Sequence, residues 1–337
     1  MNSNSINAND ANKLFKKGQD ALKVSYLSFK FSPDHLSAVS YFTDAAKAFK
    51  KSRLFRESIK AFEEAIKCNK QLLEGWAEGQ NWHEIAEVYF YELNDFNTGW
   101  KSLQNSSMAF KLSGKFTSGI KVFLDNAHKF IEKGESISAL VLLKSAYDDC
   151  LEQTQDELIR ISLEESFGFY LDALCQASKF QDAINVVESY INVQKKIPNE
   201  SKNKISKNYV KLAMLRCIID EVYMAENIVQ EMFGFYDSSC SDDIDDLRKL
   251  IKSFKEANKK DFTYLMTYAY SLFQNNLLKA LRNQFEKVSA NRISNVTNVI
   301  PIETISLNSD DWNETKASSE MGFSVDVNIR NNADEFL

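Results

Sequence analysis

The stretch SRLFRESIKAF, Ser52 to Phe62, has counterparts along most of the chain. They are LNDFNTGWKSL (93–103), GESISALVLL (134–143), ASKFQDAINVV (177–187) and DEVYMAENIV (220–229). The apolar residues that take the same place in the five stretches lie 41, 41, 43 and 43 residues apart and are Phe55, Phe96, Ile137, Phe180 and Tyr223. A spacing this regular indicates an internal repeat, and repeats of this length are typical of stacked helical units.

Each repeat has the apolar pattern of a helical hairpin. Ala45 and Phe49 lie on one face of a helix before Phe55, and Ile59 and Phe62 lie on one face of the helix after it. A single hairpin cannot bury its own apolar stripe, so successive hairpins stack on one another. We therefore predict an all-α protein, a right-handed superhelical solenoid of tetratricopeptide-like helical hairpins, with a period longer than the roughly 34 residues of that repeat.

The composition agrees with long helices. The 337 residues include only 10 Gly and 3 Pro, which is well below average usage, and no stretch shows the sustained alternation of a sheet. We predict a body over 1–288, with hairpins to about residue 235 and a C-terminal helical bundle over 236–288. The expected helices are 8–23, 36–51, 54–68, 76–93, 96–112, 116–133, 137–152, 157–177, 180–195, 205–219, 222–235, 242–257 and 261–286.

Residues 289–337 differ in composition from this body. They are rich in Asn, Ser and Thr and carry 3 basic and 8 acidic groups. Such a segment buries too little apolar surface to offset the entropy of ordering it, so we predict a disordered acidic tail.

Charge and cysteine usage indicate the compartment. The chain has no apolar run of membrane-spanning length and no hydrophobic signal segment at its start, which favours a cytosolic protein. Five separated cysteines without a CxxC pair are expected to be buried free thiols: Cys68, Cys150, Cys175, Cys217 and Cys240. Residues 1–60 carry 11 basic and 5 acidic groups within a chain of net charge −6, so the front end suits an anionic surface.

The sequence has no motif of a catalytic or nucleotide-binding site. It lacks GxxxxGK, GxGxxG, GxSxG and HExxH patterns, and its three histidines, His35, His83 and His128, fall in different repeats. We therefore predict a protein that is not an enzyme, with no catalytic, cofactor-binding or metal-binding residues. An acidic chain without a basic helical stripe also gives no reason to expect nucleic acid as a partner.

Three stretches resemble a known family. SYLSFKFSPDHLSAVSYFTDAAKAFK (25–50), GKFTSGIKVFLDNAHKFIE (114–132) and KLAMLRCIIDEVYMAENIVQEMF (211–233) are similar to segments of the soluble NSF attachment proteins, most closely to the gamma branch. These proteins are adaptors that load a hexameric AAA+ ATPase, NSF, onto SNARE bundles. The resemblance therefore implies a non-enzymatic adaptor for SNARE disassembly in vesicle fusion and intracellular transport.

The resemblance also assigns a role to the first connection between helices. In this family an exposed apolar loop at that place touches the bilayer, and here the matching residues are Tyr26, Leu27, Phe29 and Phe31. Lysines on either side would favour an anionic leaflet. The alternative is that some of the four apolar residues close the end of the hairpin stack. We expect a protein that is cytoplasmic and peripheral on the cytosolic face of membranes.

Other residues match partner-binding positions of the family. Lys115, Lys121 and Lys211 match basic positions that face the SNARE complex, which would be of the syntaxin type, whereas Glu165 stands where the family has a basic residue. The ATPase-facing residues implied by the resemblance are Asp242, Asp243, Asp245, Asp246 and Leu337. Carboxylates at a helix start also favour the helix dipole, so capping is an alternative explanation for the four aspartates.

A second function remains compatible with the residues. A tetratricopeptide-like scaffold subunit of another cytosolic complex would show the same repeat and the same absence of catalytic motifs. Capture of the ATPase distinguishes the two functions, because only the adaptor recruits it.

Overall fold

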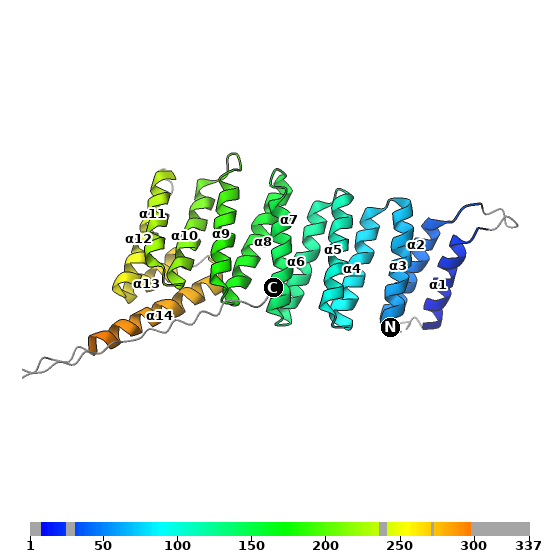
Figure 1. Ribbon diagram of the computed structural model, residues 1–337, viewed down its shortest axis with the longest axis horizontal. Coiled ribbons are helices and arrows are strands. Elements are labelled where there is room, and N and C mark those ends of the chain that lie inside the picture. Colours follow the sequence, from blue (N-terminus) through cyan, green and yellow to red (C-terminus); the bar gives the residue numbers. More distant parts are fainter. Residues whose placement is uncertain (1–7, 25–30, 236–240, 271–272, 298–337) are drawn as a thin grey trace, which may run out of the picture. The chain divides into compact units, whose positions relative to one another are not determined.

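The computed structural model describes residues 8–24, 31–235, 241–270 and 273–297. The chain divides into two units, residues 1–294 and 295–337, and the described residues of the second unit are 295–297. Every regular element of the described residues is helical, which confirms the predicted all-α class (Figure 1). The helices are α1 (Ala8–Leu22), α2 (His35–Lys51), α3 (Phe55–Leu72), α4 (Gly75–Glu87), α5 (Phe96–Leu112), α6 (Phe116–Glu132), α7 (Ser136–Leu151), α8 (Glu157–Gln176), α9 (Phe180–Gln194), α10 (Lys202–Ile218), α11 (Val222–Phe235), α12 (Ser241–Glu256), α13 (Lys259–Tyr264) and α14 (Asn275–Thr297).

Short connections join these helices into hairpins. At the α5–α6 and α6–α7 connections the chain reverses at Gly114 and Gly134, whose φ values of 76° and 79° favour glycine. The next amide then donates to a carbonyl of the preceding helix, as when Lys115 N–H donates to Phe110 O at 2.8 Å. This is the Schellman arrangement that ends a helix and turns the chain.

Neighbouring helices pack in chain order, which confirms the stack of sequential hairpins. Aromatic rings fill the space between them: the Phe90 ring centroid lies 5.4 Å from that of Phe96 and 5.1 Å from that of Phe130. The Phe167 and Tyr190 rings stack at 4.1 Å. None of the helices in the described part of the chain has the length and hydropathy that a membrane-spanning segment requires.

Three of the five residues that define the repeat, Phe55, Phe96 and Phe180, pack against the core, and the other two do not. Ile137 is 81% exposed, and Tyr223 is also exposed. Helices α7 and α11 begin one residue earlier, at Ser136 and Val222. In these two repeats the position equivalent to Phe55 is therefore one residue earlier, at Ser136 and Val222. Val222 packs against the core.

The C-terminal helices also differ from the prediction. The helix expected over 261–286 is interrupted, because α13 continues into a π-helical turn over Leu265–Ala269 and α14 begins only at Asn275. Asp172 of α8 fixes that start, since its carboxylate accepts from Asn276 N–H at 3.2 Å and from Asn276 Nδ2 at 2.8 Å. Helix α14 reaches Thr297, beyond the predicted start of the tail at residue 289.

The predicted state of the cysteines is confirmed where the structure describes them. Cys68, Cys150, Cys175 and Cys217 are buried free thiols, and Cys240 lies outside the described residues. Burial raises the pKa of the Cys150 thiol to about 12, because an apolar environment disfavours the thiolate.

Candidate partner-binding surfaces

Helices α1 and α2 form the first hairpin of the stack. The two helices approach closely, because Gly18 presents no Cβ to the Phe42 ring and the Phe15 and Phe42 rings meet at 5.2 Å. Asp34 starts α2 by accepting from Ser37 N–H at 2.9 Å. We call the connection between α1 and α2, residues 23–34, the N-terminal corner; its described residues are 23, 24 and 31–34.

The four apolar residues predicted to contact a membrane belong to the N-terminal corner. Phe31 is described, and 66% of its surface is exposed. Leu36, in the first turn of α2, is exposed as well. Tyr26, Leu27 and Phe29 lie outside the described residues.

Two of the predicted SNARE-facing lysines are exposed on α6. Lys115 is the residue before the first turn of this helix, and Lys121 follows in its second turn. Glu165, where the family has a basic residue, is exposed on α8. The structure thus leaves the side chains of both lysines at the surface.

Lys211 has different surroundings from the other two lysines. Its ammonium group lies over the rings of Phe167 and Phe273, at 5.1 and 5.8 Å from their centroids, and donates to Asn208 Oδ1 at 3.1 Å. Burial lowers its pKa to about 8, because removal from water disfavours the charged form. Lys211 therefore packs against α8 and the segment before α14, and is only partly exposed.

The four predicted ATPase-facing aspartates occupy the first two turns of α12, which we call the acidic start of α12. Asp242 is exposed and forms no ion pair with another described residue. Asp243 accepts from the buried Ser206 hydroxyl at 2.6 Å. Asp245 pairs with Arg248 at 3.2 Å and Asp246 with Lys249 at 3.3 Å, one turn further along the same helix. Leu337 lies outside the described residues.

A set of polar side chains that the sequence analysis missed links α2, α4 and α6. Glu87 of α4 pairs with Lys50 of α2 at 3.4 Å and with Lys129 of α6 at 2.5 Å, and Lys50 also reaches Glu84 at 2.9 Å. We call this set, together with His83, Tyr91 and Asn126, the polar ladder. One signal was present in the sequence, since Glu87 and Lys129 lie one repeat apart.

Hydrogen bonds fix the protonation of His83 in the polar ladder. Asn126 Oδ1 accepts from the Tyr91 hydroxyl at 2.8 Å, so Asn126 Nδ2 is the donor, and it reaches Val122 O at 2.8 Å and His83 Nε2 at 3.0 Å. His83 Nε2 must therefore accept, which requires the neutral ring. Burial is the main cause that lowers the pKa of His83, which agrees with this assignment.

Nothing in the described residues gathers the side chains of a metal centre, since no group of three or more His, Cys, Asp or Glu side chains meets there. The surfaces above consist instead of exposed apolar residues, isolated lysines and carboxylates. Such groups suit contacts with macromolecules or membranes.

Comparison with known proteins relates the chain to one protein family. A family model described as "Soluble NSF attachment protein, SNAP" matches residues 9–274, which extend from α1 to the residue before α14. No curated protein matches the chain in sequence. Among solved structures, NprR in complex with its cognate peptide NprX is 15% identical, with a TM-score of 0.31 over 86% of this chain and 76% of that chain. BtubC from P. vanneervenii is 11% identical, with a TM-score of 0.29 over 71% of this chain and 95% of that chain.

Proposed function

Because the chain belongs to the soluble NSF attachment protein family, we propose that it is an adaptor that binds SNARE complexes and recruits an NSF-type AAA+ ATPase to disassemble them. Proteins of this family are non-enzymatic adaptors, so the ATP is consumed by the partner. The single observation that carries the proposal is the family match over residues 9–274, which includes every hairpin before α14.

The N-terminal corner is the proposed membrane contact. Phe31 and Leu36 expose apolar surface beside α1, whose exposed basic residues include Lys16 and Lys17. Apolar side chains gain free energy on leaving water, and lysines gain more next to an anionic leaflet. Tyr26, Leu27 and Phe29 are proposed to act with Phe31 in a peripheral contact on the cytosolic face of membranes.

The proposed SNARE-facing residues are Lys115, Lys121 and Lys211. Lys115 and Lys121 have exposed ammonium groups that can approach an acidic helical bundle, and several such charges together give steering and register. Lys211 is expected to contribute least, because its ammonium is already held over two aromatic rings. Assignment to the gamma branch and to syntaxin-type SNAREs is part of this proposal.

The proposed contact for the ATPase is the acidic start of α12, together with Leu337. Asp242 and Asp245 are its most exposed carboxylates, and the pair between Asp245 and Arg248 is solvent-exposed. An exposed pair of this kind contributes little to stability, so its carboxylate can exchange partners at small cost. Basic grooves on the ATPase are the expected partner surface.

The proposal is tested by capture of the purified hexameric ATPase on immobilised full-length protein. We expect capture by the parent protein in the presence of SNARE complex, and clear loss of capture by an Asp242→Lys/Asp245→Lys variant. Asp148→Lys, on the exposed surface of α7, is the matched control for one charge reversal and should leave capture unchanged. If the parent protein captures no ATPase at low or at high salt, the adaptor function is wrong, and a scaffold subunit of another complex is favoured.

A further inference from the structure

Three connections of the hairpin stack lie along one edge. Because successive helices are antiparallel, the α1–α2, α3–α4 and α5–α6 connections fall on the same side, and the α2–α3 and α4–α5 connections fall on the opposite side (Figure 1). The N-terminal corner is therefore the first of three neighbouring turns on this edge.

The next two turns on this edge expose large apolar side chains. Leu73, at the α3–α4 connection, is 91% exposed, and Leu112, at the end of α5, is 78% exposed. Trp76 and Met108, within one turn of them, are exposed too. We call Leu73, Trp76, Met108 and Leu112 the edge patch.

The backbone at Leu73 is unusual for leucine. Its φ of 58° lies in the left-handed region, which a bulky residue adopts at a cost and which Gly or Asn adopts more readily. The corresponding turns at α4–α5 and α5–α6 have Asn94 and Gly114. The chain thus keeps an exposed leucine where local conformation favours a smaller or polar residue.

The opposite edge of the same hairpins lacks this surface. Among the described residues of the α2–α3 and α4–α5 connections, the large apolar side chain with the greatest exposure is Leu93, at 37%. Exposed apolar groups are normal when scattered, but within these three hairpins they gather on one edge, which indicates an interaction surface. Beyond these hairpins the opposite edge exposes Ile137, at the α6–α7 turn.

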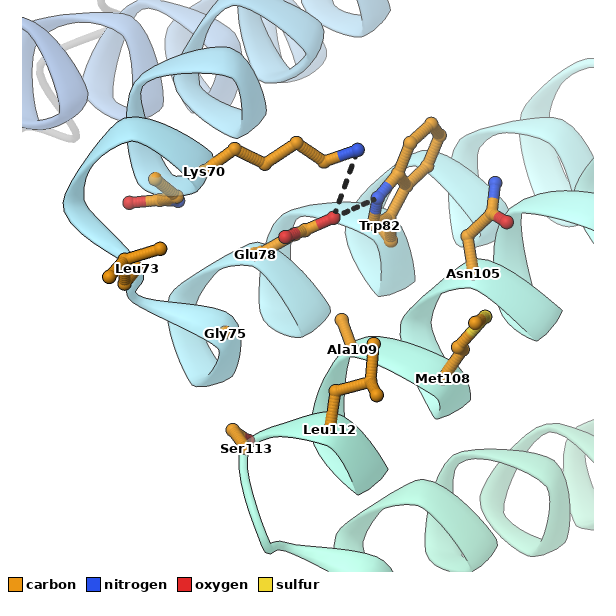
Figure 2. Close-up of a pocket in the computed structure, with 11 residues that line it drawn as sticks. Lys70, Leu73, Gly75, Glu78, Trp82, Asn105, Met108, Ala109, Leu112 and Ser113 are labelled. Carbon is orange, nitrogen blue, oxygen red and sulfur yellow. Dashed lines mark hydrogen bonds and ion pairs between the residues drawn. The ribbon is translucent and has the colours of Figure 1, made fainter.

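A groove lies within the edge patch. It has a volume of about 610 Å³, and Figure 2 shows Leu73 on one side and Met108 and Leu112 on the other. Glu78 in the groove holds Lys70 Nζ at 3.4 Å and accepts from Trp82 Nε1 at 3.2 Å (Figure 2). Lys70, Glu78 and Trp82 satisfy one another, whereas the buried Nδ2 of Asn69, which also lines the groove, has no hydrogen-bond partner among the described residues.

Charge limits how far along the edge a membrane contact could extend. The following turn, α7–α8, also exposes Leu158, but there Glu152, Asp156 and Glu157 are exposed beside it. An anionic leaflet would repel these three carboxylates, whereas the charged residues exposed within three positions of Leu73 and Leu112 are Lys70, Glu74 and Lys115, two of them basic. The apolar edge that suits a bilayer therefore comprises the first three hairpins.

From this continuity we propose that the edge patch is a second membrane contact beside the N-terminal corner, so that the protein meets a bilayer along an edge formed by three turns. The inference rests on the proposed membrane contact of the corner. Leu73 and Leu112 enter the outer part of the acyl region, and Trp76 lies at the headgroup level, where tryptophan is favoured. Two contacts on one chain bind more tightly than either alone, because the second binds at a high effective concentration.

The test is a flotation titration of the full chain with phosphatidylcholine vesicles containing phosphatidylserine. Leu73→Ser/Leu112→Ser should weaken binding about tenfold, as expected for partial removal of two apolar side chains from the bilayer. Ile137→Ser is the matched control, because Ile137 is as exposed as Leu112 but lies at the α6–α7 turn on the opposite edge. It should bind like the parent.

A fluorescent label locates the contact directly. An environment-sensitive fluorophore on Leu73→Cys, in a Cys240→Ser background, should shift to the blue on addition of vesicles, and the same label on Ile137→Cys should not. If Phe31→Ser weakens flotation while the Leu73→Ser/Leu112→Ser variant binds like the parent and the label at residue 73 does not shift, the second contact is wrong and the corner stands. A parent protein that does not float overturns both contacts, while ATPase capture still tests the adaptor function separately.

Discussion

The polar ladder and the acidic start of α12 contain similar charged groups in different surroundings. In the ladder, Glu87 is held by Lys50 and Lys129 from two other helices, and its side chain is largely buried. In α12, the partners of Asp245 and Asp246 among the described residues are Arg248 and Lys249, one turn away on the same helix. The difference teaches that the ladder's charges hold helices together, whereas the exposed Asp245 of α12 contributes little to the fold and remains accessible to a partner.

The largest expected effect on stability comes from Glu87→Ala. The substitution leaves Lys50 and Lys129 without their shared carboxylate in a partly buried place, so we expect the free energy of unfolding to fall by about 2–3 kcal/mol. Chemical denaturation of parent and variant measures this. Asp245→Ala, which removes an exposed carboxylate, should change the free energy by less than about 1 kcal/mol. Equal losses in the two variants would abolish the distinction between the regions.

The free energy of unfolding, measured as a function of pH, tests the buried state of His83 in the polar ladder. Burial lowers the pKa of His83 in the folded protein, so the unfolded chain binds the proton first as the pH falls. The contribution of His83 is therefore fully present above the unfolded pKa of about 6.5 and is lost below it, with a slope of at most about 1.4 kcal/mol per pH unit. His83→Gln should remove that part of the pH dependence, and a variant that keeps the whole slope between pH 6.5 and 5 would contradict the assignment.

Glu87 gives the free energy of unfolding a second dependence on pH, at lower pH than His83. Lys129 lowers the pKa of Glu87 against the opposing effect of burial, so its contribution is present above the unfolded value of about 4.5 and is lost as the pH falls through the lower folded pKa. The loss attributed to His83 begins at higher pH, so the two groups are distinguishable in one titration.

Within α12, neighbouring aspartates should differ. Asp243→Ala removes the acceptor of the buried Ser206 hydroxyl, and we expect a loss of about 1–2 kcal/mol in the free energy of unfolding. Asp242→Ala removes an exposed carboxylate and should change it by no more than about 0.5 kcal/mol. Thermal and chemical unfolding of this pair distinguish a structural carboxylate from an available one. A larger loss for Asp242→Ala than for Asp243→Ala would reverse our assignment.

The smallest effect on stability is expected at the N-terminal corner. Phe31→Ser removes a ring that is mostly exposed, so the free energy of unfolding should stay within about 0.5 kcal/mol of the parent value. Flotation with vesicles should nevertheless fall about tenfold, because the ring's transfer from water is lost. A large loss of stability would mean that Phe31 packs in the fold and would remove the argument for membrane contact.

Much of the architecture was predictable because it depends on local pattern. Apolar periodicity locates most helix ends to within a few residues. The repeat also predicted the hairpins, yet it misplaced Ile137 and Tyr223 by one residue, since a spacing identifies equivalent segments more securely than equivalent side chains. The break between α13 and α14 was not predictable, because no Gly or Pro marks it in the sequence. The start of α14 is fixed by Asp172, which lies about a hundred residues earlier in the chain.

The candidate surfaces were predictable only in part. The family resemblance assigned the same role to Lys115, Lys121 and Lys211. Only the structure shows that their surroundings differ, because it places the Lys211 ammonium group over the rings of Phe167 and Phe273. The edge patch was not predicted, because Leu73 and Leu112 read as ordinary apolar residues of a helical repeat.

By itself the sequence determined that this protein is a succession of helical hairpins with a basic front end, since helix formation, turn chemistry and net charge follow from residues close together in the chain. The tertiary structure alone decided which polar groups are shared between helices and which apolar groups stay in water. Those outcomes depend on residues one repeat or more apart, such as Glu87 with Lys129, whose contact exists only once the hairpins have stacked.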